Sequence, residues 1–197
     1  MVLIKNEGGL LPLTSPATTK VAFIGPHANS TQDLLSNYHG TNLLVNTHSP
    51  FQSAVSAGMQ VTYAKGCNIC DVVPQGYPNM PCVPSQQTDT SGIAAAVAAA
   101  KAADVAVLFL GSDQSTEAEN FDRSSITLVG VQEQLLAAVL KVQPKTVVVL
   151  IHGGPLASTQ IATNVPAVLE AFYPGELGGD AIVNTLLGKN NPGGKMP

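Results

Sequence analysis

The sequence predicts an α/β protein in which a mainly parallel sheet carries helices on both faces, as in a flavodoxin-like α/β sandwich. Short apolar runs bounded by glycine or proline recur along the chain, and segments with helical spacing lie between them. Two of the runs are almost continuously apolar, as expected for strands that are buried on both faces of a parallel sheet. The steady alternation of strand and helix indicates right-handed βαβ units.

The elements follow in chain order. Strands are predicted for residues 21–24, 60–64, 105–110, 146–151 and 168–173. Helices are predicted for residues 50–57, 91–102, 131–141 and 178–187. In the third helix Val131, Leu135 and Val139 share one face, with Leu136 and Leu140 beside them, which gives a stripe that faces the core. Because ligands collect at the carboxyl ends of strands in such sheets, we expect the chemistry in the loops that follow residues 24, 110, 151 and 173.

Bulk properties restrict the class of protein. A chain of 197 residues, 45% of them hydrophobic, suffices for one sizeable core, so we expect a single domain over residues 1–197. The formal net charge is -4 and the chain has no basic cluster, which argues against nucleic acid or an anionic membrane surface as a partner. The apolar runs fall far short of the roughly 20 residues needed to cross a bilayer. Residues 1–6 lack the features of a signal peptide.

Three cysteines, Cys67, Cys70 and Cys82, lie in one stretch rich in proline and asparagine. No further cysteine or nearby histidine completes a set of four zinc ligands, so no metal site is expected. We expect a disulfide from Cys82 to Cys67 or Cys70, because tying a long excursion across its base removes loop entropy from the unfolded chain. The segment 71–74 favours an extended or turn conformation over the helix that a redox motif opens. Three reduced thiols remain the alternative.

A sequon for N-glycosylation occurs at Asn29, followed by Ser30 and Thr31. Together with a disulfide, it indicates an oxidising compartment and hence a secreted protein.

Several familiar motifs are absent from the sequence. The turn after the first predicted strand lacks GxGxxG spacing, the glycine-rich tail 188–196 misses the spacing of a P-loop, and there is no G-x-S-x-G elbow. No nucleotide cofactor is therefore expected. The segment His152-Gly153-Gly154 could offer backbone N–H groups to an anion, but we favour close packing of strand and helix with the histidine at the domain surface.

The loop after the third predicted strand is the strongest candidate for chemistry. It holds four carboxylates, Asp113, Glu117, Glu119 and Asp122, together with Arg123. Like charges held close together raise the pKa of one member, while a fixed arginine keeps another as a carboxylate. One acid could then stay protonated near neutral pH, as a general acid must. The alternative is a merely solvated, charged face.

This loop resembles the E-x-E-x-x-D-R signature of the second domain of family 3 glycoside hydrolases, here residues 117–123. The wider run 111–119 is closest to the β-xylosidase branch. Four other segments also resemble family patterns, in the right order over nearly the whole chain: 5–13 (K-N-x-x-x-L-L-P-L), 37–40 (N-Y-x-G), 173–176 (Y-P-G-E) and 191–197 (N-P-x-G-K-L-P).

The resemblance implies a retaining, exo-acting β-glycosidase, a β-D-xylosidase that releases terminal xylose from xylo-oligosaccharides during xylan catabolism. It makes Glu119 the general acid/base, lets Glu117 support the loop or contact sugar, and lets Asp122 and Arg123 fix the loop's shape. The Asp nucleophile belongs to an N-terminal TIM-like barrel, which residues 1–197 do not include, so this chain alone is expected to be inactive. No cofactor is implied. Asn120 departs from the glycine that the family often has, a change that could alter the backbone beside the acid.

Two alternatives remain open. The chain could belong to a β-glucosidase or an α-L-arabinofuranosidase, because most contacts to the sugar would come from the barrel. It could also be a stand-alone, non-catalytic carbohydrate-binding or regulatory module, which binding of xylose or xylobiose would distinguish.

Overall fold

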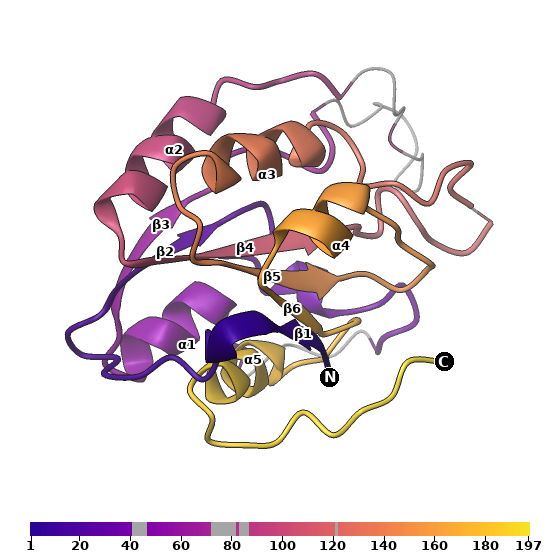
Figure 1. The fold of residues 1–197 in the computed structure, drawn as a ribbon. Coiled ribbons are helices and arrows are strands. Elements are labelled where there is room, and N and C mark those ends of the chain that lie inside the picture. The colour runs from indigo at the N-terminus through magenta and orange to yellow at the C-terminus, as the bar shows by residue number, and fades with distance from the viewer. Residues whose placement is uncertain (41–46, 72–81, 83–86, 121) are drawn as a thin grey trace.

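The computed structural model describes residues 1–40, 47–71, 82, 87–120 and 122–197, and it confirms the predicted fold class (Figure 1). The strands are β1 (Val2–Asn6), β2 (Lys20–Ile24), β3 (Gln60–Ala64), β4 (Val105–Gly111), β5 (Thr146–Ile151) and β6 (Ala167–Glu170). The helices are α1 (Pro50–Ser56), α2 (Ile93–Ala102), α3 (Gln132–Leu140), α4 (Thr159–Asn164) and α5 (Gly178–Leu186). Two 3-10 helices cover Glu7–Gly9 and Gln32–Leu34.

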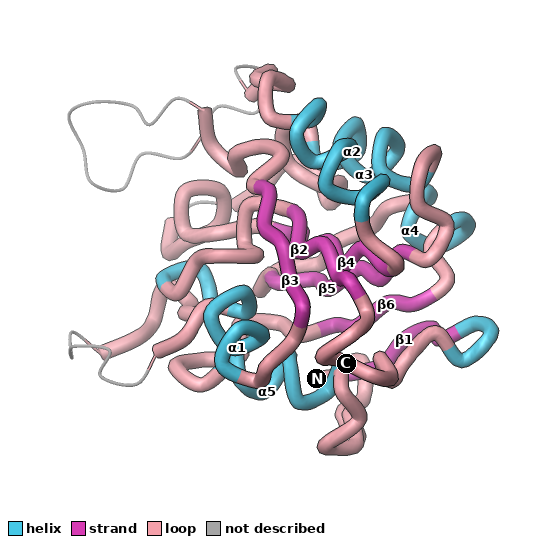
Figure 2. The backbone as a smooth tube through the Cα atoms, turned by 90° about the vertical axis from the view of Figure 1, so that its left-hand side faces the viewer, coloured by secondary structure: helices cyan, strands magenta, loops and turns pink. Residues whose placement is uncertain are grey.

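The strands form one sheet in the order β1-β6-β5-β4-β2-β3. All neighbours are parallel except β1, which runs antiparallel to β6. Leaving β1 aside, this is the flavodoxin-like order, whose topological switch lies between β2 and β4. Helices α2, α3 and α4 cover one face of the sheet, and α1 and α5 cover the other (Figures 1 and 2).

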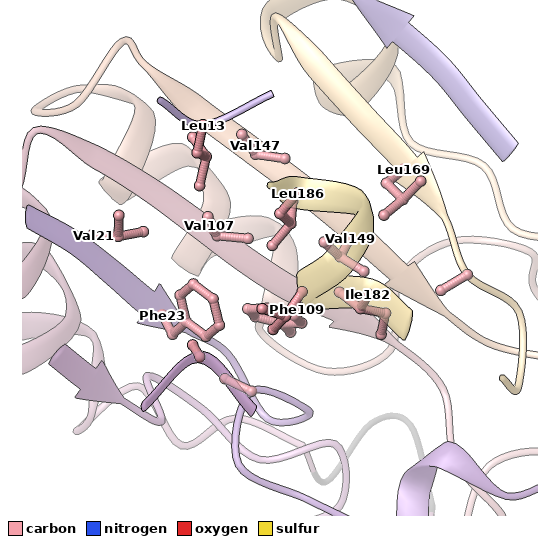
Figure 3. Close-up of a cluster of buried hydrophobic side chains, with 14 of the residues drawn as sticks. Leu13, Val21, Phe23, Val107, Phe109, Val147, Val149, Leu169, Ile182 and Leu186 are labelled. Carbon is pink, nitrogen blue, oxygen red and sulfur yellow. The ribbon is translucent and has the colours of Figure 1, made fainter. Parts of the chain in front are cut away.

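Each face of the sheet has its own core. On one face Ile182 and Leu186 of α5 pack over the central strands, where the rings of Phe23 and Phe109 lie 4.8 Å apart (Figure 3). On the other face the predicted stripe of α3 is buried, with Leu135 among its fully buried members. Burial on both faces explains why β4 and β5 are apolar at nearly every position.

Two elements were not predicted. Strand β1 is a half-buried edge strand with mixed polarity, and α4 has only six residues, most of them polar. Neither has the length or the apolar periodicity that marks an element in a sequence. Helix α4 begins where the side chain of Ser158 accepts a hydrogen bond from the backbone N–H of Ile161 at 3.2 Å.

The last strand also ends earlier than predicted, at Glu170 rather than at residue 173. Phe172 has a φ of 54°, in the left-handed region, which turns the chain out of the sheet. Its backbone N–H donates to the Glu170 carboxylate at 3.0 Å. Ala171, directly after β6, is still buried, so the apolar pattern of the sequence extends beyond the end of the strand.

The exit of the chain from β4 requires a glycine. Gly111 has a φ of 148°, and a Cβ atom there would lie 1.8 Å from the carbonyl oxygen of Ile151 on β5. The side chain of Gln132, at the start of α3, both accepts from the N–H of Gly111 and donates to its carbonyl, each at 2.8 Å. This arrangement fixes where the acidic loop leaves the sheet.

The structure contains a disulfide between Cys70 and Cys82, one of the two pairings expected, and Cys67 is free and buried. Burial, with a smaller contribution from Asp71, raises the pKa of the Cys67 thiol to about 12. The backbone N–H of Cys82 donates to the carbonyl of Ser115 at 2.6 Å, so the disulfide lies beside the acidic loop. The expected turn at 71–74 falls mostly outside the described residues.

Two further observations concern partners. Within the described ranges no helix is long and apolar enough to span a membrane, and no three His, Cys, Asp or Glu side chains are grouped as a metal site would require. Asn29 is exposed, and its Oδ1 accepts a hydrogen bond from the Ser49 hydroxyl at 2.7 Å. Glycosylation at Asn29 stays a prediction.

Candidate active site

An open cavity of about 530 Å³ lies at the carboxyl edge of the sheet, where the topology predicted it. Its walls come from the segment 36–38, the acidic loop after β4, the turn 153–155 after β5, and Tyr173 after β6. Three consecutive parallel strands therefore deliver their loops to one place.

Glu117 lies at the centre of a clamp. Its Oε1 accepts hydrogen bonds from the backbone N–H of Gly153 at 2.6 Å and from the hydroxyl of Tyr173 at 2.7 Å. Its Oε2 accepts from Nε of Arg123 at 3.1 Å and from the N–H of Gly154 at 3.2 Å. Only 14% of the Glu117 side chain is exposed. These contacts hold the acidic loop against the two neighbouring loops.

The clamp keeps Glu117 ionised. Burial acts to raise its pKa, but the hydrogen bonds from Tyr173 and Gly153, and the nearby charge of Arg123, outweigh it and lower the pKa. Burial, followed by the hydrogen bond to Glu117, raises the pKa of Tyr173. The Tyr173 hydroxyl therefore stays neutral and donates. The expectation that arginine would keep one acid as a carboxylate thus applies to Glu117, although Tyr173 and Gly153 contribute more than Arg123.

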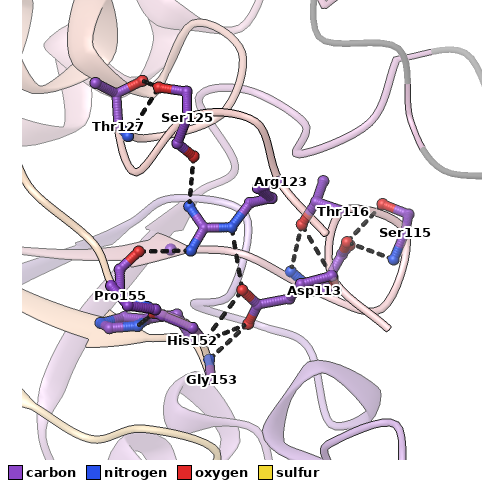
Figure 4. A network of polar contacts seen from close by, with 12 residues as sticks. Asp113, Ser115, Thr116, Arg123, Ser125, Thr127, His152, Gly153 and Pro155 are labelled. Atoms are coloured by element: carbon purple, nitrogen blue, oxygen red, sulfur yellow. Dashed lines mark hydrogen bonds and ion pairs between the residues drawn. The ribbon is translucent and has the colours of Figure 1, made fainter. Parts of the chain in front are cut away.

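Arg123 joins the same loops on the other side of the carboxylate. Its Nη2 donates to the carbonyl of Pro155 at 2.7 Å and its Nη1 to the carbonyl of Ser125 at 3.4 Å (Figure 4). Asp122 is exposed on the cavity wall and forms no hydrogen bond or ion pair with the residues that the structure describes.

The interpretation of His152 as a surface residue was wrong. His152 is only 5% exposed, and its Nε2 lies 2.9 Å from Oε2 of Glu170, which is 2% exposed. The glycines after it present N–H groups to an anion, and that anion is the Glu117 carboxylate. A Cβ atom at Gly153 would lie 2.7 Å from the Tyr173 ring, so this close approach requires glycine. The sequence could not show that the anion comes from the protein itself.

The pKa of Asp113 in the acidic loop is raised, but not by crowding among the loop's own carboxylates. Burial, with a contribution from the charge of Asp33, raises the pKa of Asp113. Its Oδ1 accepts hydrogen bonds from the N–H and the hydroxyl of Ser115 at 2.9 and 2.5 Å, so it shapes the turn at the start of the loop. Asp33 belongs to the segment after β2. Asp113 does not line the cavity, whereas Glu117, Glu119 and Asp122 do.

Glu119 is exposed and lines the cavity, two residues after the clamped Glu117. Asn120 follows it with a φ of 66°. Asparagine is one of the few residues with a side chain that adopts this left-handed conformation readily. The replacement of the family's glycine by Asn120 therefore retains a backbone that a glycine would also adopt.

The sequence analysis missed Tyr173 as a contributor to the site, and it set aside the anion-binding role of Gly153 and Gly154 in favour of close packing. The sequence did mark these positions, since Tyr173 opens the Y-P-G-E segment and the two glycines lie just after a buried strand, behind His152. What the sequence lacked was any sign that they meet at Glu117.

Comparisons with known proteins agree with the geometry. The sequence model described as the glycosyl hydrolase family 3 C-terminal domain matches residues 1–197. All of the chain aligns with a β-xylosidase from Formosa agariphila at 35% identity, covering 26% of that protein, and with an exo-1,4-β-xylosidase from Aspergillus niger at 36%, covering 23% of it. The chain thus spans about a quarter of the length of these curated relatives.

Solved structures show the same relationship. A β-glucosidase from Erythrobacter marinus superimposes with a TM-score of 0.82 at 37% identity, over 97% of this chain and 27% of that one. A family 3 exo-β-xylosidase in complex with a xylobiose aziridine probe gives a TM-score of 0.80 at 34% identity, over 96% of this chain and 22% of that one.

Proposed function

Because this chain belongs to glycoside hydrolase family 3, in which it corresponds to the C-terminal domain, we propose that it supplies the general acid/base, Glu119, to a retaining, exo-acting β-glycosidase. In this proposal residues 1–197 are the second domain of a longer enzyme. Its partner is an N-terminal TIM-like barrel of the same protein, which carries the Asp nucleophile.

The contrast between two neighbouring glutamates carries the proposal. Glu117 is held as a carboxylate by four donors, so it has no proton to give and little freedom to move. Asp113 is bonded to Ser115 and does not line the cavity. Glu119 and Asp122 remain as exposed carboxyl groups on the cavity wall. Of these two we propose Glu119, the position that the resemblance to the family signature implies for the acid/base.

The chemistry assigned to Glu119 has two steps. It first protonates the departing glycosidic oxygen while the nucleophile of the barrel forms the glycosyl-enzyme, and it then takes a proton from the incoming water. Retaining enzymes need the two carboxyl groups about 5–5.5 Å apart. A side chain exposed at the edge of one domain is able to approach a nucleophile on another.

The substrate that we propose is the terminal β-D-xylose of xylo-oligosaccharides, in xylan catabolism by a secreted enzyme. The curated relatives named β-xylosidase support it. A β-glucosidase is the second candidate, because the solved β-glucosidase is 37% identical to this chain. An arabinofuranosidase is the third, since one relative at 35% identity is named β-xylosidase/α-L-arabinofuranosidase. Binding of xylobiose by this chain without any hydrolysis by the longer enzyme would instead support a non-catalytic module.

The test uses a chain that carries both domains. Glu119→Ala should slow xylosides with poor leaving groups far more than activated ones, because help from an acid matters most where the departing oxygen is basic. Azide should partly restore turnover of an activated substrate, since it attacks the glycosyl-enzyme without a base. Asp122→Asn is the matched control and should show neither effect. If Asp122→Asn or Glu117→Ala gives this pattern and Glu119→Ala does not, the assignment is wrong.

A further inference from the structure

We propose that His152 and Glu170 form a positioning pair behind the acid/base loop. Doubly protonated His152 holds the turn from which Gly153 and Gly154 bind Glu117, so that loss of its proton loosens the loop and lowers turnover. The kinetic part of this inference rests on the function proposed for Glu119.

The hydrogen-bond partners define the protonation state of His152. Its Nδ1 lies 2.7 Å from the carbonyl oxygen of Gly154, which only accepts, so Nδ1 carries a proton. Its Nε2 lies 2.9 Å from Oε2 of Glu170, whose Oε1 accepts from the N–H of Phe172 at 3.0 Å. With Glu170 ionised, its Oε2 can only accept, so Nε2 also carries a proton and we assign His152 as an imidazolium.

The charged and titratable groups around the ring favour this state. Burial acts to lower the pKa of His152, but the hydrogen bond and the charge of Glu170, together with Gly154 and the charge of Glu117, outweigh it and raise the pKa. Glu170 ends β6, Glu117 and Arg123 belong to the acidic loop, and Tyr173 follows β6 as a neutral hydroxyl. Asp113 also belongs to this loop but is bonded to Ser115.

The four charges balance in pairs. His152 with Glu170 and Arg123 with Glu117 are two ion pairs, each with both side chains at most 14% exposed. Loss of the histidine proton leaves one surplus negative charge among groups with little access to water, which is costly.

The turn 152–155 transmits this change to the acid/base loop. Neutral His152 keeps one ring proton, and the carboxylate of Glu170 attracts it to Nε2 because a charged acceptor makes the stronger bond. Nδ1 then turns a lone pair towards the Gly154 carbonyl, and the bond that closes the turn is lost. Glu117 depends on the N–H groups of Gly153 and Gly154 in this turn, and Glu119 lies two residues further on.

Nuclear magnetic resonance of the ¹⁵N-labelled chain tests the structural part without any assumption about catalysis. Both ring nitrogens of His152 should carry protons near about pH 7, where an ordinary histidine is mostly neutral. On raising the pH, the amide signals of Gly153 and Gly154 should move in the same titration as the His152 ring. One ring proton at neutral pH, or glycine amides that ignore the titration, would overturn the proposal.

Glu170→Gln separates geometry from charge. The amide can donate to Nε2 of a neutral His152, which then keeps its Nδ1 proton on Gly154, so the glycine amides should stay in their bonded positions across the pH range. Glu170→Ala leaves Nε2 without a partner, so the ring loses the contact that fixes its orientation towards the Gly154 carbonyl, and the turn should loosen at every pH. The matched control is Asp180→Asn, which removes the carboxylate of an exposed histidine pair, His48–Asp180 at 3.6 Å, and should change neither signal.

The kinetic part is measured in the enzyme with both domains, on a xyloside with a poor leaving group. Glu170→Ala should lower kcat about tenfold with little change in KM, and Glu170→Gln should restore most of it, because a small misplacement of a catalytic group is enough to cost this much. Wild-type kcat for Glu170→Ala would overturn the proposal. If Glu170→Ala does not fold, the titration of the wild-type chain decides. Wild-type turnover by Glu119→Ala would instead refute the proposed function and leave the titration result intact.

Discussion

Replacing Glu117 by glutamine should destabilise the folded chain by about 2–4 kcal/mol near pH 7. The substitution keeps the size of the side chain but removes a charge that accepts from Gly153, Gly154, Tyr173 and Arg123. A hydrogen bond to a charged group contributes about 1.5–3 kcal/mol, and removing one partner of a buried ion pair costs about 3–5 kcal/mol. The amide oxygen of glutamine still accepts from some of these donors, so the expected loss is smaller than the sum of these contributions.

The assay is urea unfolding of the chain, with Glu7→Gln as the matched control. Glu7 also forms an ion pair, with Lys5 at 3.2 Å, but its side chain is 66% exposed. An exposed pair of this kind contributes about 0–1 kcal/mol, so the control should be nearly neutral. Equal losses for the two variants would refute the idea that the clamp around Glu117 stabilises the fold.

The pH dependence gives a second check on Glu117. Because its folded pKa is lowered below the unfolded value, its contribution is present above the ordinary carboxyl pKa and is lost as the pH falls through the folded pKa. The difference in stability between wild type and Glu117→Gln should therefore shrink in acid. A difference that is the same in acid and at neutral pH would contradict the assignment of Glu117 as a carboxylate.

Three other predictions follow from the structure and the proposal. The 197-residue chain alone should not hydrolyse nitrophenyl β-xyloside, because an acid without a nucleophile cannot form the glycosyl-enzyme; robust turnover that survives Glu119→Ala would contradict this. Mass spectrometry of the non-reduced peptides should find Cys70 linked to Cys82 and Cys67 free after expression in an oxidising compartment; three free thiols would refute the bridge and weaken the inference of secretion. Gly111→Ala should lower the free energy of unfolding in urea by at least about 3 kcal/mol, because its Cβ would meet the carbonyl of Ile151. The control Gly58→Ala, with open space around it, should lower it by only about 1 kcal/mol. Equal losses would show that the close approach at Gly111 relaxes easily.

The fold was predictable where burial leaves a strong pattern. Strands β4 and β5 are buried at every position, so their apolar runs were unambiguous. The edge strand β1 and the short helix α4 depend on neighbours instead: β1 on its pairing with β6, and α4 on its cap at Ser158. Local composition carries little information about such elements, because tertiary contacts supply most of their stability.

The candidate site was predictable only in part, and for a related reason. Topology predicted the edge of the sheet at which the cavity lies, and the resemblance to the family signature selected Glu119, whose role stays a proposal. The clamp joins Glu117 to Gly153, 36 residues away, and to Tyr173, 56 residues away, through loops that have no periodicity. From charge alone, we expected crowding among the loop's own acids to shift their pKa values. Instead, burial and Asp33 raise the pKa of Asp113, and hydrogen bonds from Tyr173 and Gly153 lower the pKa of Glu117.

The clamp gives a physical reason for a fixed glutamate two positions before an exposed one. Two residues of extended chain span at most about 7 Å, so the backbone of Glu119 cannot move far from the anchored Glu117. Only Ala118 lies between them and it has just two soft dihedral angles, while Asn120, directly after Glu119, is itself in the left-handed conformation. The side chain of Glu119 nevertheless remains exposed and free of the clamp. If Glu119 is the acid/base, Glu117 ties its backbone to the loops of the sheet and so sets its distance from a nucleophile on another domain. Its carboxyl group meanwhile stays free to exchange a proton with the leaving oxygen and with water.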